Sequence, residues 1–154
     1  MVYLVRHAHA GRKAEWDGPD LARPLSAIGR RQAAGLVVRL RHYPVHRILC
    51  SPADRCRQTV EPLARHRGVA VEATSVLGVD ATADGVLELL GDQAIQHAVL
   101  CTHGELIGQV FDKLLAGGLD VPGRPRWPKG STWVLARDGG RVADASYLDP
   151  LVPC

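Results

Sequence analysis

Short apolar runs alternate along the chain with segments whose apolar residues recur at helical spacing. The runs lie at residues 2–5, 47–50, 69–73 and 97–102, and continuous apolar runs of this kind are typical of strands buried on both faces. Helical patterns follow at residues 26–40, 51–64, 84–90 and 105–115. The alternation predicts an α/β fold, a three-layer α/β/α sandwich with a mostly parallel central sheet.

Local signals place the ends of several elements. Ser26 is a predicted N-cap, and Ser51 is a second one, with Pro52 at the first helical position. Residues 131–136 and 141–148 flank an Asp-Gly-Gly turn and predict a C-terminal β-hairpin. Polar segments rich in Gly and Pro, at 11–24 and 117–130, predict loops. Because no repeat interrupts this order, we expect one domain over residues 1–154.

Length and composition agree with an ordinary globular domain. A chain of 154 residues can bury a sizeable core, and its 46% hydrophobic and 23% charged residues are close to average. No apolar run approaches the ~20 residues of a membrane-spanning helix. The N-terminus reaches Arg6 and His7 too early for the apolar region of a signal peptide. These features predict a cytoplasmic protein with no membrane partner.

Charge and cysteine content narrow the function classes further. The net charge of +3 hints at an anionic ligand but is too small and scattered to predict nucleic-acid binding. Three tryptophans provide no platform for stacking bases. The four cysteines form no C-x-x-C pair. Cys50 and Cys101 end apolar runs, which predicts buried free thiols.

Reactive side chains gather where three predicted strands end. They lie at residues 6–7, 51–55 and 102–104. Open α/β sheets bind ligands beyond the carboxyl ends of their strands, so we expect Arg6, His7, Arg55 and His103 to share one pocket. Helix N-termini favour anions, and the planar fork of arginine suits phosphate. The pattern predicts a phosphate site that contains an imidazole nucleophile.

The two histidines of "RHAHAG" allow a second interpretation. Strand alternation would place His7 and His9 on the same side, where they could form a metal-binding pair. Such a site needs a third ligand, and the adjacent Arg6 is electrostatically adverse. We therefore predict no metal and no cofactor, and interpret His9 as a residue at the rim or a substrate contact.

Three motifs in this order resemble the histidine phosphatase superfamily, the phosphoglycerate-mutase-like or RHG family. They read "LVRHAHAG", "CSPADRCRQT" and "CTHGELI", with Ala8 where the family pattern has Gly. The segment "RPLSAIGRRQA" is similar to short SixA-type phosphohistidine phosphatases. The segments "DRCRQTVEPLA" and "KGSTWVLARDGGRV" resemble the phosphatase half of Nudix–histidine-phosphatase fusions, although no Nudix box is present.

The resemblance implies a role for each matching residue. His7 would take up the phosphoryl group, Arg6 and Arg55 would clamp its oxygens, and His103 would donate a hydrogen bond to it. Further phosphate- or substrate-binding positions follow from the same patterns: Arg23, Ser51 and Gly104.

One family feature is missing from its expected place. Larger members carry a Glu that protonates the leaving oxygen, but residues 76–90 have no Glu at their start. Asp80 is the candidate acid there, followed by Asp84. Leaving groups that need little protonation are then favoured: phosphohistidine, acyl phosphate or phosphoanhydride.

The function that follows is a metal-independent phosphatase with a phosphohistidine intermediate on His7. Its partner would be a phosphohistidine protein, a nucleotide or a small phosphorylated molecule, bound between the 11–24 loop, with Trp16, and the 117–130 loop. The alternative is a weakly catalytic module that binds a phosphorylated ligand.

Overall fold

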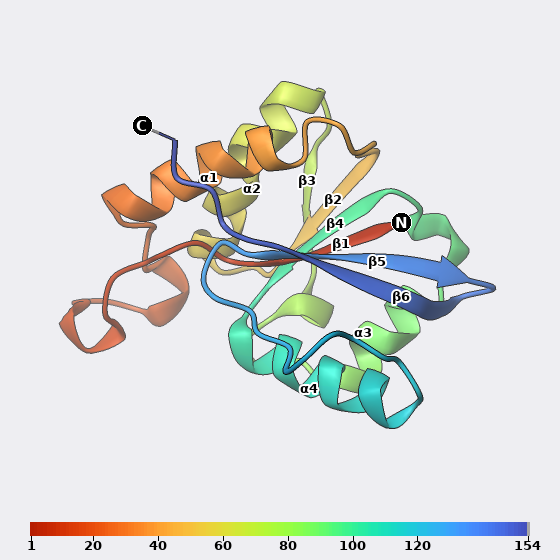
Figure 1. The fold of residues 1–154 in the computed structure, drawn as a ribbon. Helices are drawn as coiled ribbons and strands as arrows, with labels where there is room; N and C mark the ends of the chain where they lie inside the picture. The colour runs from red at the N-terminus through yellow and green to blue at the C-terminus, as the bar shows by residue number, and fades with distance from the viewer. Residues whose placement is uncertain (154) are drawn as a thin grey trace.

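A mixed six-stranded sheet forms the centre of the computed structural model, which describes residues 1–153 (Figure 1). Cys154 lies outside the described residues. The strand order is β3-β2-β4-β1-β5-β6. The bounds are β1 Val2–Arg6, β2 Arg47–Cys50, β3 Val71–Ala73, β4 Ala98–Thr102, β5 Thr132–Asp138 and β6 Arg141–Leu148. The first four strands are parallel to one another. The antiparallel hairpin of β5 and β6 pairs with the free edge of β1 through β5.

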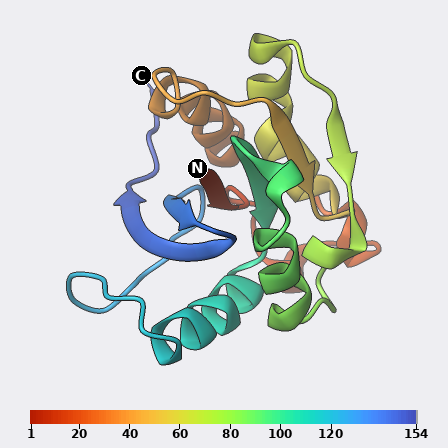
Figure 2. The ribbon, with the colours of Figure 1, turned by 90° about the vertical axis from the view of Figure 1, so that its right-hand side faces the viewer.

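Two layers of helices cover the sheet. Helices α1 (Ala27–Arg39) and α2 (Asp54–Arg67) lie on one face, and α3 (Ala83–Leu90) and α4 (Gly104–Ala116) on the other (Figures 1 and 2). Alternate residues of β1 divide between the layers. Tyr3 and Val5 pack with the α1–α2 core, and Leu4 packs with the α3–α4 core. The predicted three-layer fold with its C-terminal hairpin is confirmed.

The element starts show which local predictions hold. Ser26 caps α1, because its Oγ accepts the N–H of Gly29 at 3.0 Å. The predicted cap at Ser51 is wrong, since α2 begins at Asp54 with Ala53 at its N-cap. Ser51 Oγ contacts Nε2 of His103 at 2.8 Å instead, so a tertiary contact overrides the local rule. The third strand is also shorter than predicted and begins at Val71.

Strand pairing brings the three predicted reactive segments together. β4 lies between β1 and β2, with Arg6 opposite Thr102 and Cys50 opposite Cys101. The carboxyl ends of all three strands therefore meet at one edge of the sheet. The loop over this edge, residues 11–24, contains two short 3-10 helices, Lys13–Glu15 and Asp20–Ala22.

Two further sequence predictions concern the core and the membrane. Cys50, Cys56 and Cys101 are buried free thiols, as the apolar runs predicted for Cys50 and Cys101. Within residues 1–153, no helix has both the length and the apolar character that crossing a bilayer requires.

Candidate active site

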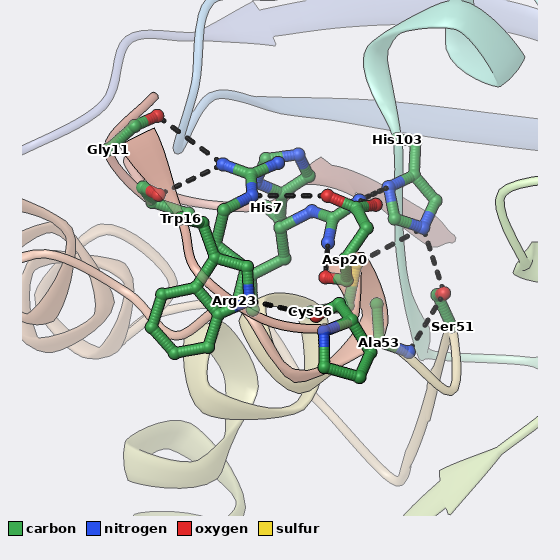
Figure 3. Close-up of polar contacts among 12 residues, drawn as sticks. His7, Gly11, Trp16, Asp20, Arg23, Ser51, Ala53, Cys56 and His103 are labelled. Atoms are coloured by element: carbon green, nitrogen blue, oxygen red, sulfur yellow. Dashed lines mark hydrogen bonds and ion pairs between the residues drawn. The ribbon is translucent and has the colours of Figure 1, made fainter. Parts of the chain in front are cut away.

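The four predicted residues come from the ends of β1, β2 and β4, which meet at the carboxyl edge of the sheet, and Figure 3 shows His7 and His103 among them. The ring centroids of His7 and His103 are 5.4 Å apart, and Nη2 of Arg55 lies 3.4 Å from Nδ1 of His103. Arg6, His7 and Arg23 line one hollow of about 560 Å³. Of the four residues expected to share a pocket, Arg6 and His7 line this hollow, and Arg55 and His103 contact each other without being among its lining residues.

His7 is held as a neutral imidazole. It follows β1 directly, is only 6% exposed, and its backbone N–H donates to the carbonyl of Thr102 at 3.0 Å. Nδ1 lies 2.8 Å from the carbonyl oxygen of Ala8, so Nδ1 carries the proton and Nε2 keeps its lone pair. Burial lowers the pKa of His7 to about 3, and the field of neighbouring Arg55 and Arg6 acts in the same direction. The imidazole of His7 is thus unprotonated at Nε2 at neutral pH.

Ala8, which replaces the glycine of the family pattern, fits the chain conformation without strain. Its φ is not in the positive region, and its methyl group packs in a small buried cluster with Leu25 and Ala33. Its N–H donates to Oγ1 of Thr59 at 2.9 Å, and Thr59 donates to the carbonyl of Arg55 at 2.6 Å. Thr59 therefore links the segment after His7 to the helix that carries Arg55.

Arg6 lies against the N-terminus of α4 because position 104 has no side chain. A Cβ at Gly104 would lie 2.7 Å from Cζ of Arg6. Nη1 of Arg6 donates to the carbonyl of Trp127 at 3.0 Å, and the N–H of Gly130 approaches the carbonyls of Arg6 and His7, each at 3.1 Å. Nε of Arg6 is buried and has no hydrogen-bond partner in the described part of the chain. Such a donor is suited to an anion.

Arg55 and Arg23 share a carboxylate that the sequence reasoning missed. Nη2 of Arg55 pairs with Oδ2 of Asp20 at 3.1 Å, and Nε of Arg23 pairs with Oδ1 of Asp20 at 3.2 Å. Nη1 of Arg55 also donates to the carbonyl of Asp20 at 2.9 Å. Burial would raise the pKa of Asp20, but the two arginines outweigh it and lower this pKa. The only sequence signal was Asp20 three residues before Arg23 in a loop.

Arg23 belongs to the site and not to the outer surface. It is 8% exposed, and its Nη1 donates to the carbonyl of Ala10 at 2.9 Å. Together with Arg6 and Arg55 it forms a set of three guanidinium groups, which we call the arginine clamp.

Ser51 contacts the ring nitrogen of His103 that is opposite the one facing Arg55. His103 occupies the N-cap position of α4, but its side chain makes no capping hydrogen bond. Its Nε2 lies 2.8 Å from Oγ of Ser51, while Nδ1 faces Arg55. These partners favour the tautomer in which Nε2–H donates to Ser51. Ser51 itself is fully buried, so it contacts His103 and not the open side of the pocket.

The first half of the chain matches a family model. Residues 2–78 match the histidine phosphatase superfamily (branch 1), and this span holds His7 and four further site arginines or carboxylates: Arg6, Asp20, Arg23 and Arg55. The chain belongs to the histidine phosphatase superfamily.

Relatives and solved structures similar to this chain agree with its fold and family. An 8-oxo-(d)GTP phosphatase of Mycolicibacterium smegmatis is 33% identical over 97% of this chain, and the chain spans 48% of that protein, about half its length. A solved structure assigned as SixA from Nakamurella multipartitia has a TM-score of 0.75 at 24% identity, covering 97% of this chain and 95% of the other. A protein histidine phosphatase SixA complexed with tungstate has a TM-score of 0.74 at 19% identity, covering 99% and 97%.

Residues 76–90, where larger members of the superfamily carry their acid, place neither candidate carboxylate against the arginine clamp. Asp80 is exposed and lines a different hollow, of about 290 Å³, beside Ser51 and Pro52. Asp84 pairs with Lys113, in the last turn of α4, at 2.9 Å. Neither carboxylate makes a hydrogen bond to the arginine clamp within residues 1–153.

His9 makes two contacts near the start of α1. Its Nδ1 lies 2.7 Å from Oγ of Ser26, and its N–H donates to Oε1 of Gln32 at 2.8 Å. Since β1 ends at Arg6, strand alternation does not extend to His9. In the described range, no three His, Cys, Asp or Glu side chains gather closely enough to hold a metal ion.

Basic residues continue the hollow beyond the clamp. Arg12, Lys13 and Lys129 line it together with Arg6 and Arg23. Burial lowers the pKa of Lys129, and the positive arginines lower it further. Trp16 contacts its own loop, since Nε1 donates to the carbonyl of Pro19 at 2.9 Å. The wall of the hollow is therefore strongly positive.

Proposed function

We propose that this protein is a metal-independent phosphatase that works through a phosphohistidine intermediate on His7. The observation that carries the proposal is the neutral imidazole, fixed by the Ala8 carbonyl and facing an arginine clamp. Nε2 of His7 attacks phosphorus, and the bond from phosphorus to the leaving group breaks. Water then attacks the phosphohistidine, the P–N bond breaks, and orthophosphate leaves with His7 regenerated.

The clamp supplies what phosphoryl transfer needs most, which is positioning and preorganised positive charge. Two of its buried donors, Nε of Arg6 and Nε of Arg55, have no partner within residues 1–153. We assign these arginines and Arg23 to the phosphoryl oxygens. His103 adds a further hydrogen bond in its other tautomer, in which Nε2 accepts from the Ser51 hydroxyl and Nδ1–H donates to the phosphoryl group as Nη2 of Arg55 turns to that group. Gly104 contributes by admitting Arg6, and Ser51 by orienting His103.

For the substrate we propose a phosphoanhydride, as in a nucleotide, or a phosphohistidine protein. The basic wall of Arg12, Lys13 and Lys129 extends positive charge past the transferred phosphoryl group, which favours a substrate with more than one phosphate. The name of the Mycolicibacterium smegmatis relative points to a nucleoside triphosphate, and those of the SixA structures to phosphohistidine.

Turnover of an activated aryl phosphate in excess chelator tests the reaction. We expect wild-type turnover and an acid-labile phosphoryl label on His7, and neither in His7→Ala. His66→Ala, which removes an exposed imidazole, is the matched control and should behave as wild type. Wild-type rates in His7→Ala would refute the proposal. Binding of orthophosphate without any turnover would favour a phospho-ligand binding module.

A substrate panel then separates the candidate classes. Nucleoside di- and triphosphates, a phosphohistidine peptide and simple monoesters should be compared by kcat/KM. We expect the anhydrides or the phosphohistidine peptide to exceed the monoesters, because their leaving groups need less protonation. A preference for alkyl monoesters would contradict the proposed substrate class.

A further inference from the structure

A carboxylate, that of Asp20, is bound to the arginine clamp, and the proposed function gives it no role. Asp20 is 24% exposed at its side chain and bonds through separate oxygens to Arg55 and Arg23. It belongs to the 3-10 helix Asp20–Ala22, whose end is closed by the N–H of Arg23 on the Asp20 carbonyl at 3.1 Å. Backbone and side chain together hold this carboxylate in one place, paired with Arg55 and with Arg23, and Figure 3 shows Asp20 and Arg23 side by side.

We propose that Asp20 carries the proton in both halves of the reaction. This inference rests on the proposed function. In the first half, as the P–O bond breaks, the carboxyl group of Asp20 gives its proton to the leaving oxygen. In the second half, the carboxylate of Asp20 takes a proton from the water that attacks phosphorus, while the P–N bond electrons return to His7. The carboxyl group is regenerated, so protons balance over one turnover.

The position of Asp20 follows from the donors it shares with the phosphoryl group. Arg55 and Arg23 contact Asp20 and are the same groups proposed to bind phosphoryl oxygens. Acceptors on one guanidinium fork lie a few ångströms apart, at ordinary hydrogen-bond lengths. A phosphoryl group bound by these arginines therefore places its oxygens next to the carboxylate of Asp20.

Substrate binding itself would prepare Asp20 to act as an acid. In the free protein the two arginines keep the carboxylate ionised. A dianionic phosphoryl group neutralises those arginines and adds negative charge beside Asp20, and both effects favour its protonated form. After the leaving group departs with the proton, the carboxylate is restored as a base for water. One residue can thus serve both halves.

Other carboxylates near the pocket are less well placed. Asp80 faces a different hollow, and Asp84 is paired with Lys113. Glu105 is exposed in the first turn of α4 and shares a separate hollow with Arg6. None of the three bonds to Arg55 or Arg23 among residues 1–153, so Asp20 is the carboxylate that the clamp selects.

A leaving-group series in Asp20→Asn tests the inference. The amide keeps the size of the side chain, one acceptor oxygen and the backbone contact to Arg55. With dinitrophenyl phosphate, whose leaving group needs no proton, we expect kcat/KM to stay within about threefold of wild type. With phenyl and alkyl phosphates we expect a fall of about 10²–10⁴-fold, the usual contribution of general acid catalysis. The phosphohistidine on His7 should accumulate, because water attack is slowed.

Three variants serve as controls. Asp17→Asn makes the same chemical change at an exposed position of the same loop and should match wild type throughout. Asp20→Glu retains a carboxyl group and should restore the wild-type leaving-group dependence, even at a lower kcat. It also covers the case in which Asp20→Asn does not fold. Asp80→Asn should show no selective loss with poor leaving groups.

Each other result would overturn the inference. An equal loss of kcat/KM with all leaving groups would make Asp20 only a positioning residue for the arginines. An equal gain would make it only a competitor for the phosphate site. A selective loss in Asp80→Asn or Glu105→Gln would move the role to that residue. If wild type forms no label on His7, the proposed function fails as well, whereas label formation with leaving-group-independent loss overturns the role of Asp20 alone.

Discussion

Replacement of Gly104 by alanine isolates the placement of Arg6 from the stability of the fold. The added Cβ would lie 2.7 Å from Cζ of Arg6, while carbon contacts are favourable only beyond about 3.5 Å. The guanidinium group must therefore move by about 0.8 Å or more. Its hydrogen bond to the carbonyl of Trp127, now 3.0 Å, would be strained or lost.

The expected effects on activity and stability have opposite signs. A misplacement of about 1 Å at a reacting centre can cost about 10²-fold in rate, so we expect kcat/KM to fall by about 10–100-fold with an aryl phosphate. Alanine also favours the helix over glycine by up to about 1 kcal/mol, so the Tm should stay the same or rise. Steady-state kinetics and thermal unfolding measure the two effects separately.

Gly85→Ala is the matched control in the first turn of α3. A Cβ at Gly85 meets Oγ1 of Thr82 at an ordinary contact of 3.7 Å, away from the arginine clamp. It should gain helix stability and keep full activity. Our reasoning about Arg6 would be refuted if Gly104→Ala kept wild-type kcat/KM, or if its activity fell only in proportion to a loss of folded protein.

Two further predictions concern the clamp and the nucleophile. Arg55→Ala should cost about 2–4 kcal/mol of transition-state stabilisation, the size of losing one preorganised donor. Arg57→Ala on the same helix should cost almost none, because its partners Asp54 and Glu61 are outside the site. Equal losses of kcat/KM in the two variants would contradict the assignment of Arg55. Because the folded pKa of His7 is about 3 and its ordinary value is 6.5, the unfolded chain binds more protons between these values. The free energy of unfolding should therefore fall as pH drops from about 6.5 towards 3, by at most about 1.4 kcal/mol per pH unit from this group, and not change with it above about 6.5. His7→Gln should lack this contribution, which urea unfolding of both proteins at a series of pH values would measure. If the free energies of unfolding of the two proteins changed in parallel with pH, the neutral imidazole of His7 would be contradicted.

The fold was predictable because its signals are local. Each buried strand is a short apolar run, so β1, β2 and β4 could be located from the sequence. Each long helix carries an apolar stripe, so the helices between them could be located as well. Their order in the sheet was not needed to expect a shared site. It was enough that parallel strands end at the same edge, where Arg6, Arg55 and His103 follow.

Contacts between residues far apart in the sequence were not predictable. The cap rule placed a helix start at Ser51, but the hydroxyl group is engaged by His103, far along the chain. His9 was interpreted as a residue at the rim or a substrate contact, and the structure adds a contact from its ring to Ser26, the N-cap of α1. In both cases a side chain that suits one local role is recruited by a neighbour that only the tertiary structure brings near.

Asp20 and Arg23 show why loops are hardest to interpret. The 11–24 segment has no apolar periodicity, so nothing in it predicts which side chains turn inward. Arg23 was expected to bind phosphate only because of the family resemblance, and no pattern in the sequence singled out Asp20. In the structure Asp20, at the start of the 3-10 helix Asp20–Ala22, pairs with both Arg23 and Arg55.

The arginine clamp is tied to the loops that surround it, and this connects substrate choice to catalysis. Arg23 donates to the carbonyl of Ala10, Arg55 to that of Asp20, and Arg6 to that of Trp127. Each guanidinium group is thus oriented before any substrate binds, which is the condition for electrostatic stabilisation of a transition state at little reorganisation cost. The carbonyl of Ala10 immediately precedes the 11–24 loop, and that of Asp20 lies within it. The carbonyl of Trp127 belongs to the 117–130 loop. Changes in either loop should therefore alter kcat as well as KM, because the walls that would select the substrate also aim the charges that act on it.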